Sequence, residues 1–330
     1  MAAEDSARFV RRAGAVLTSE VLEQLEADVV NLAEQYLRRP PYAMFKPLSA
    51  LRAEMFEMLE GHPRPEHAKE LYRVAGLVSS LLAHLSSDLG QPYGVDTHTR
   101  AAWLCADLSG DNHQRAYIRW VQSQVAYWQH DYTRSADLAR HGQQFAQVGE
   151  SMLRLASQEA RALAALGDEH ETTRVLQRAG SSIEATLDQQ PAPGVFYFPA
   201  GKAAYYAAEA HIALGGTAHL HQAVADAERS LALFAAGHGR SPELVAAAQL
   251  DLVTAHFGLD DLDAGAEHLA PVLQLPVESR TMPVIERTLK IAASLTNDRY
   301  ADSAAAGDLR DQLDQFCSYS AGGGAPQLPA

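Results

Sequence analysis

Apolar residues recur at steps of three and four along most of this chain, and short turns with similar residues interrupt the pattern. This spacing puts apolar side chains on one face of a helix, whereas a half-buried strand alternates every two residues. The first three runs predict helices over about 22–36, 42–60 and 65–90. The best strand candidate, Val195–Phe198, has prolines on both sides and is too short for a sheet. The sequence therefore predicts an all-α fold.

The turns between these helices indicate internal repetition. Taking positions 90, 130, 167, 215 and 260 as equivalent gives spacings of 37 to 48 residues, longer than the roughly 34-residue tetratricopeptide period. Small residues follow the turns and let paired helices approach closely, but one pair cannot bury both of its faces. We expect a tetratricopeptide-like right-handed superhelix of stacked antiparallel helix pairs with a concave inner surface. The alternative is an irregular helical bundle in which the similarity between the turns is accidental.

This repeat pattern divides the chain into three parts. Residues 1–65 are expected to form N-terminal helices that cap the array, and 66–317 the repeats with C-terminal capping helices. The glycine-rich segment 318–330 is expected to be a disordered tail. Five apolar residues near the C-terminus predict either a homodimer surface or the C-terminal cap: Ile291, Leu295, Leu309, Leu313 and Phe316.

Charge and cysteine content narrow the classes of function. The chain has 27 Lys and Arg against 41 Asp and Glu, a net charge of −14, so a nucleic-acid partner held by this chain itself is not expected. Two cysteines, Cys105 and Cys317, are too few for a disulfide framework or a cysteine-rich zinc site. No apolar stretch resembles a signal peptide or a membrane span. We expect a cytoplasmic protein without a membrane partner.

Enzyme and metal motifs are absent from the sequence. There is no Gly-x-Ser-x-Gly elbow, no phosphate-binding Gly-Lys-Ser/Thr and no dinucleotide-binding glycine fingerprint after a strand. His170-Glu171 begins like a zinc-protease motif, but Arg174 stands where the second histidine is required. The sequence therefore predicts a non-enzymatic protein with no metal and no cofactor.

The inner wall of a tetratricopeptide array is formed mainly by the first helix of each pair, so a fixed register selects the residues that face it. Applied here, that register predicts a ligand-binding stripe on the middle repeats: His84, Tyr117, Trp120, Gln124, Tyr127, Arg154, Arg161, Lys202, Tyr205 and Glu209.

Aromatic and cationic side chains dominate this stripe. Aromatic rings offer a large contact area at low entropic cost, and arginine presents a planar fork to carboxylates. The stripe suits an extended peptide, a partner protein or a small acidic signal. The alternative is structural: the rings pack against the neighbouring repeat, and the arginines pair with carboxylates such as Glu150 and Glu159.

Six short motifs along the chain have a distinctive wording: Leu25–Asp28, Tyr36–Pro41, Ala102–Asp107, Gln122-Ser123 with Ala126–Trp128, Gly194–Phe196 with Lys202 and Tyr205-Tyr206, and Arg280-Thr281 with Pro283-Val284. Over roughly residues 4–317 they resemble the helical regulatory region of actinobacterial XRE-type transcriptional regulators. The resemblance implies tetratricopeptide-like repeats and a role in signalling and transcription.

Members of that family carry a helix-turn-helix domain ahead of a stretch like Ala2–Phe9, and no such pattern precedes it here. We therefore expect a regulatory protein that recognises a peptide, partner protein or small signal in its concave groove. The alternative is a DNA-binding regulator whose helix-turn-helix domain is absent from this chain.

Overall fold

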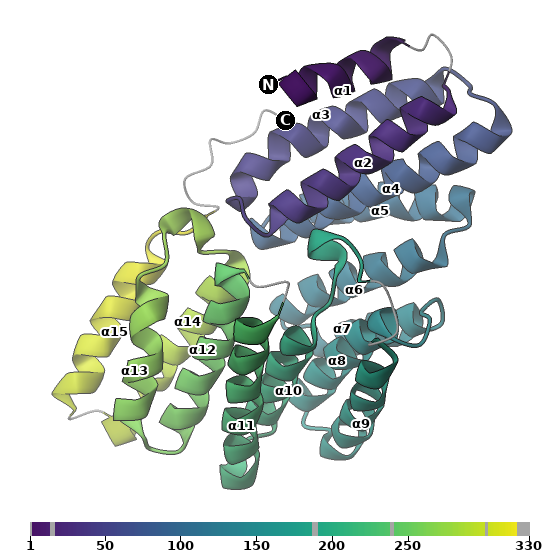
Figure 1. Cartoon of the computed structure of the whole chain (residues 1–330). Coiled ribbons are helices and arrows are strands. Elements are labelled where there is room, and N and C mark those ends of the chain that lie inside the picture. Colours follow the sequence, from purple (N-terminus) through teal and green to yellow (C-terminus); the bar gives the residue numbers. More distant parts are fainter. Residues whose placement is uncertain (1, 14–16, 187–190, 238–240, 301–302, 322–330) are drawn as a thin grey trace.

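The computed structural model describes residues 2–13, 17–186, 191–237, 241–300 and 303–321 (Figure 1). These residues contain no strand, which confirms the all-α prediction. The α-helices within them are α1 (Ala2–Ala13), α2 (Ser19–Tyr36), α3 (Pro41–Glu60), α4 (Pro65–Asp88), α5 (Pro92–Ser109), α6 (Asn112–Trp128), α7 (Tyr132–Gln143), α8 (Glu150–Ala165), α9 (Glu169–Thr186), α10 (Ala200–Leu214), α11 (Gly216–Ala236), α12 (Pro242–Gly258), α13 (Leu262–Leu273), α14 (Met282–Ser294) and α15 (Ala304–Cys317). Three short 3₁₀ helices accompany them: η1 (Gly194–Phe196), η2 (Val277–Ser279) and η3 (Asp298–Tyr300).

The turns expected from the sequence join the helices in pairs. Gly90, His130, Gly167, Gly215 and Asp260 all have left-handed backbone, with φ between 61° and 79°. Glycine adopts this conformation freely, and histidine and aspartate tolerate it better than most residues. The turns connect α4 to α5, α6 to α7, α8 to α9, α10 to α11 and α12 to α13, and the two helices of each pair pack on each other. The prediction of helices packed in adjacent pairs is confirmed.

The first helices of the pairs form one continuous layer. Helices α4, α6, α8, α10 and α12 contact one another in succession, and α14 continues the series beyond α12. Helix α14 also contacts α4, and Met282 at its start lies against the turn at Gly90. The inner layer therefore surrounds the interior of the molecule, and its two ends meet.

The N-terminal helices pack on one end of this layer (Figure 1). Helices α2 and α3 both contact α4, and α2 also contacts η1. Gly194 in η1 passes so close to α2 that a Cβ at this position would collide with the backbone of Ala33 and Glu34. A main hydrophobic core runs without interruption from α2 to the start of α12.

A second core lies at the C-terminal end, among α12, α13, α14 and α15. The five apolar residues for which the sequence allowed either a dimer surface or a C-terminal cap belong to this core. Four are buried and one is half-buried against them, so they form the C-terminal cap: Ile291, Leu295, Leu313, Phe316 and Leu309.

Most of the expected disordered tail, 322–330, lies outside the described residues. The beginning of this segment differs from the expectation, because Ala321 is buried and its N–H donates to the Arg280 carbonyl at 3.0 Å. None of the helices within the described ranges combines the length and apolar character needed to cross a membrane.

Candidate functional site

All ten residues of the predicted stripe lie together on the inner faces of α4, α6, α8 and α10. Ring contacts, hydrogen bonds and ion pairs link them into one network, in which Tyr206 of α10 connects the two halves. Half-buried Lys202 is the most accessible of the ten. The other nine are no more than 9% exposed: His84, Tyr117, Trp120, Gln124, Tyr127, Arg154, Arg161, Tyr205 and Glu209.

At one end of the network, His84 joins α2 to α6. Its Nδ1 lies 2.9 Å from the hydroxyl of Tyr117, and its ring packs against Trp120 and Tyr36. Burial holds the pKa of His84 well below its usual range, and the nearby charges of Lys202 and Arg154 lower it further. The imidazole is therefore neutral at physiological pH.

At the other end, Arg161 is enclosed by aromatic rings and carboxylate. Its guanidinium lies 4.3 Å from the ring centre of Tyr127 and 4.0 Å from that of Tyr206. Glu209 binds Arg161 at 2.7 Å and Arg287 of α14 at 2.6 Å. Burial opposes ionisation of Glu209, but the two arginines outweigh it and hold its pKa below the usual range. The ion pairs fasten α14 to α8 and α10.

The chain's own segment Gly194–Phe198 lies across the middle of the stripe and is held through its backbone. Arg154 donates a hydrogen bond to the Phe196 carbonyl, and the Phe198 N–H donates to the Glu150 carboxylate at 2.9 Å. Arg154 and Glu150 also pair with each other at 2.8 Å. An arginine and a carboxylate thus bind the backbone of one segment, as they would bind that of a peptide.

The two phenylalanines of this segment complete the contact. The Phe196 ring packs on Tyr117 with centroids 5.2 Å apart, and the Phe198 ring lies 6.3 Å from Trp120. Tyr117 and Trp120, which the stripe was expected to present to an external ligand, thus contact phenylalanines of the chain itself.

The chain itself occupies the concave groove that was expected along the stripe. The register selects the right inner-facing residues, but two features close the space in front of them. The contact between α14 and α4 joins the two ends of the inner layer, and Gly194–Phe198 fills its centre. The stripe pairs with the protein itself, as the structural alternative expected for the rings and for Arg154 with Glu150.

One pocket of about 280 Å³ remains beside this filled interior. The segments around it are the α2–α3 junction, the end of α4, the residues before α10, the start of α12 and the region of η2. Its walls combine apolar and proline residues with four buried or half-buried ionisable groups on the inner layer: His84, Asp88, Lys202 and Glu243. The same four groups border a second cavity of about 20 Å³, next to Arg161 and Arg287. We call the 280 Å³ space the inner pocket.

The carboxyls of the inner pocket have perturbed acidity. The Tyr36 hydroxyl donates to Asp88 at 2.5 Å. Burial raises the pKa of Asp88 well above its usual range, and the charge of Glu243 adds to the shift. Burial also raises the pKa of Glu243, while Lys202 acts in the opposite direction. Ionisable groups held away from their ordinary pKa inside a cavity are typical of ligand sites.

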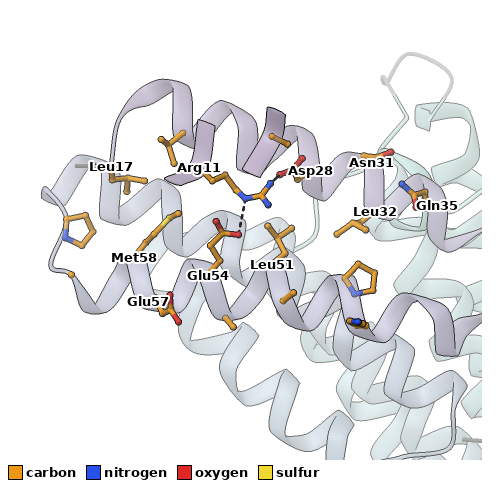
Figure 2. Close-up of a pocket in the computed structure, with 18 of the residues that line it drawn as sticks. Arg11, Leu17, Asp28, Asn31, Leu32, Gln35, Leu51, Glu54, Glu57 and Met58 are labelled. Carbon is orange, nitrogen blue, oxygen red and sulfur yellow. Dashed lines mark hydrogen bonds and ion pairs between the residues drawn. The ribbon is translucent and has the colours of Figure 1, made fainter. Parts of the chain in front are cut away.

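A larger hollow of about 1390 Å³ lies between α1, α2 and α3. Figure 2 shows Arg11 of α1 pointing between Asp28 and Glu54, with an ion pair of 2.9 Å to Glu54. Most of the residues around this hollow are exposed or half-buried, and the buried ones are apolar: Val21, Leu32 and Leu51. This outer hollow, as we call it, has no buried ionisable side chain among its described residues, whereas the inner pocket has His84 and Asp88. The inner pocket is therefore the stronger candidate site.

Sequence reasoning missed four residues of the inner region. Tyr36 belongs to α2, which the repeat register does not include, and Asp88 and Glu243 fall outside its selected positions. Arg287 lies on α14, which was expected only to cap the array. A usable signal existed, because Tyr36 and the residues just before Arg287 occur in the motifs that carry the family resemblance.

No group of three or more histidine, cysteine, aspartate or glutamate side chains in the described ranges could hold a metal ion. No protein-family model matches the chain, and no curated protein matches it significantly.

Proposed function

We propose that this chain is a non-enzymatic regulatory protein of the tetratricopeptide type that binds a small-molecule signal in the inner pocket. In this proposal the stacked helix pairs form a right-handed superhelix, and the pocket is the part of its concave surface that the chain leaves unfilled. The observation that carries the proposal is the composition of the pocket walls, which come from segments between residues 36 and 281.

A ligand at such a junction can act as a signal. It contacts the N-terminal helices, the first inner helix and the C-terminal half of the array at once. A ligand shifts a conformational equilibrium only through different affinity for the two states. Any change in how these segments meet alters the pocket, so binding favours the arrangement that closes around the ligand.

The motifs that resemble XRE-type regulators support a regulatory role. Three of them contribute residues to the inner pocket or to the cavity next to it, namely Tyr36–Pro41, Gly194–Phe196 with Lys202, and Arg280-Thr281 with Pro283-Val284. In this proposal the chain senses a signal in the cytoplasm and influences transcription, and DNA contact belongs to a helix-turn-helix domain or protein outside it.

The experiment is recovery of small molecules by the purified chain. The protein is incubated with a low-molecular-mass cell extract, washed and analysed by native mass spectrometry. Ser279→Trp adds an indole at a half-buried position on the pocket wall, while Ser181→Trp adds one at an exposed position on α9. We expect the parent and Ser181→Trp to retain the same molecule and Ser279→Trp to lose it. Equal retention by all three proteins, or none by the parent, overturns the proposal.

A further inference from the structure

Two opposite charges in the inner pocket are not paired with each other. Lys202 and Glu243 both line it, and each is half-buried. The Lys202 ammonium lies over aromatic rings, 4.9 Å from the centre of Trp120 and 5.7 Å from that of Phe198. Among the described residues, neither Lys202 nor Glu243 forms an ion pair.

This arrangement contrasts with the nearby charges of the interior. Glu209 binds two arginines and Arg154 binds Glu150. A half-buried charge in a protein is expensive unless a partner compensates it. Lys202 and Glu243 influence each other across the pocket, because Lys202 lowers the pKa of Glu243 against the larger effect of burial. The wall of the pocket therefore carries both a cationic and an acidic side chain, each without an ion-pair partner among the described residues.

Asp88 adds a second carboxyl to the pocket. The residue is 4% exposed and lines the same pocket, and its carboxyl accepts one hydrogen bond from the Tyr36 hydroxyl. The neighbouring His84 is neutral, so the interior of the pocket carries two carboxyls against the single ammonium of Lys202.

The remaining walls define the body of the ligand. They include a group of apolar and proline residues, namely Leu37, Pro40, Pro41, Val195, Pro199, Pro242 and Leu244. Three further charged residues line the pocket but are exposed to solvent: Arg38, Arg39 and Glu278. A volume of 280 Å³ lies at the lower edge of the roughly 300–1,000 Å³ of pockets that hold drug-sized ligands. The pocket therefore suits a molecule about the size of one amino acid and excludes a long peptide.

We infer that the inner pocket binds an amino-acid-sized zwitterion with an apolar side chain. Its carboxylate faces Lys202, its ammonium faces Glu243 and Asp88, and its side chain packs on the proline-rich wall. This inference rests on the proposed function and specifies its ligand class.

Isothermal titration calorimetry with L-phenylalanine and L-leucine tests the inference. Each zwitterion is compared with the analogue that lacks one charge, such as phenethylamine or 3-phenylpropionate for L-phenylalanine. We expect a zwitterion to bind about tenfold or more tightly than either analogue, because each loses one charge-assisted contact. Lys202→Met lowers the affinity for the zwitterion to that of the amine, and Glu243→Gln lowers it to that of the carboxylate.

Matched controls come from the outer hollow. Lys46→Met and Glu57→Gln remove the same charges there and leave the affinities unchanged. Equal binding of a zwitterion and a single-charge analogue, or no binding of either amino acid to the parent, overturns the inference. The proposed function is tested separately, by whether the parent retains another molecule from the extract.

Discussion

The inner region and the outer hollow both place arginine between two acidic side chains, yet they do so in different surroundings. Arg11 joins α1 to Asp28 and Glu54, whose side chains are 19% and 24% exposed. In the inner region, Arg287 of α14 reaches Glu209 and Asp251 across a buried interior. The outer contact attaches one terminal helix, whereas the inner contacts hold together helices that are distant in sequence.

The comparison shows that burial determines how much such ion pairs matter for the stability of the fold. A partly exposed ion pair competes with water and salt and contributes little to stability. A buried pair can be neutral overall, but the loss of one partner leaves a charge with no compensation. The interior charges therefore favour one arrangement of the inner helices. The inner pocket lies beside Lys202 and Glu243, two charged residues that form no ion pair with a described residue.

The largest effect is expected from Glu209→Gln, which leaves Arg161 and Arg287 without their shared carboxylate. We expect the free energy of unfolding to fall by about 3–5 kcal/mol, as for other buried pairs that lose one partner. Glu54→Gln in the outer hollow is the matched control and should cost about 1 kcal/mol or less. Urea unfolding followed by tryptophan fluorescence measures both. Similar losses in the two variants would remove the distinction between the regions.

A smaller effect is expected from Gly194→Ala, which tests the segment that fills the interior. Gly194 has φ of +53°, and its new Cβ would meet the backbone of Ala33. The strained left-handed backbone and the displacement of the segment from α2 should together lower the free energy of unfolding by about 3 kcal/mol. Gly167→Ala is the control, since φ is +79° there but no atom lies within 4 Å of the new Cβ, and about 1 kcal/mol is expected. Hydrogen exchange of α2 should rise only in Gly194→Ala. Unchanged exchange would mean that the segment does not support α2.

The smallest effect concerns the pH dependence of the inner region. Burial raises the pKa of Asp251 to about 8, although Arg287 acts against the shift. The folded state therefore keeps a proton that the unfolded state has lost, so the contribution of Asp251 to stability falls as pH rises towards 8. Between pH 6 and 8, parent stability relative to Asp251→Asn should decrease by at most about 2 kcal/mol. Parallel stability curves for the two proteins would contradict the assignment.

Much of the site was predictable residue by residue. The register placed His84, Trp120, Arg161 and Lys202 on the same inner face, and the structure brings them together. The register did not reveal that Gly194–Phe198 packs on this face or that α14 contacts α4, because it selects positions within the first helices of the five pairs only.

The sequence alone determined the helices, the turns and the side of each helix that faces inward. These depend on local spacing: an apolar period of 3.6 residues, and residues that tolerate left-handed backbone at positions such as Gly90 and Asp260. The tertiary structure alone decided that the array closes on itself, that Gly194–Phe198 fills it and that Lys202 and Glu243 remain unpaired. Closure depends on small angles between successive pairs that add up along the whole chain, and on contacts between residues as distant as Glu209 and Arg287. No local pattern of residues predicts the sum of these angles.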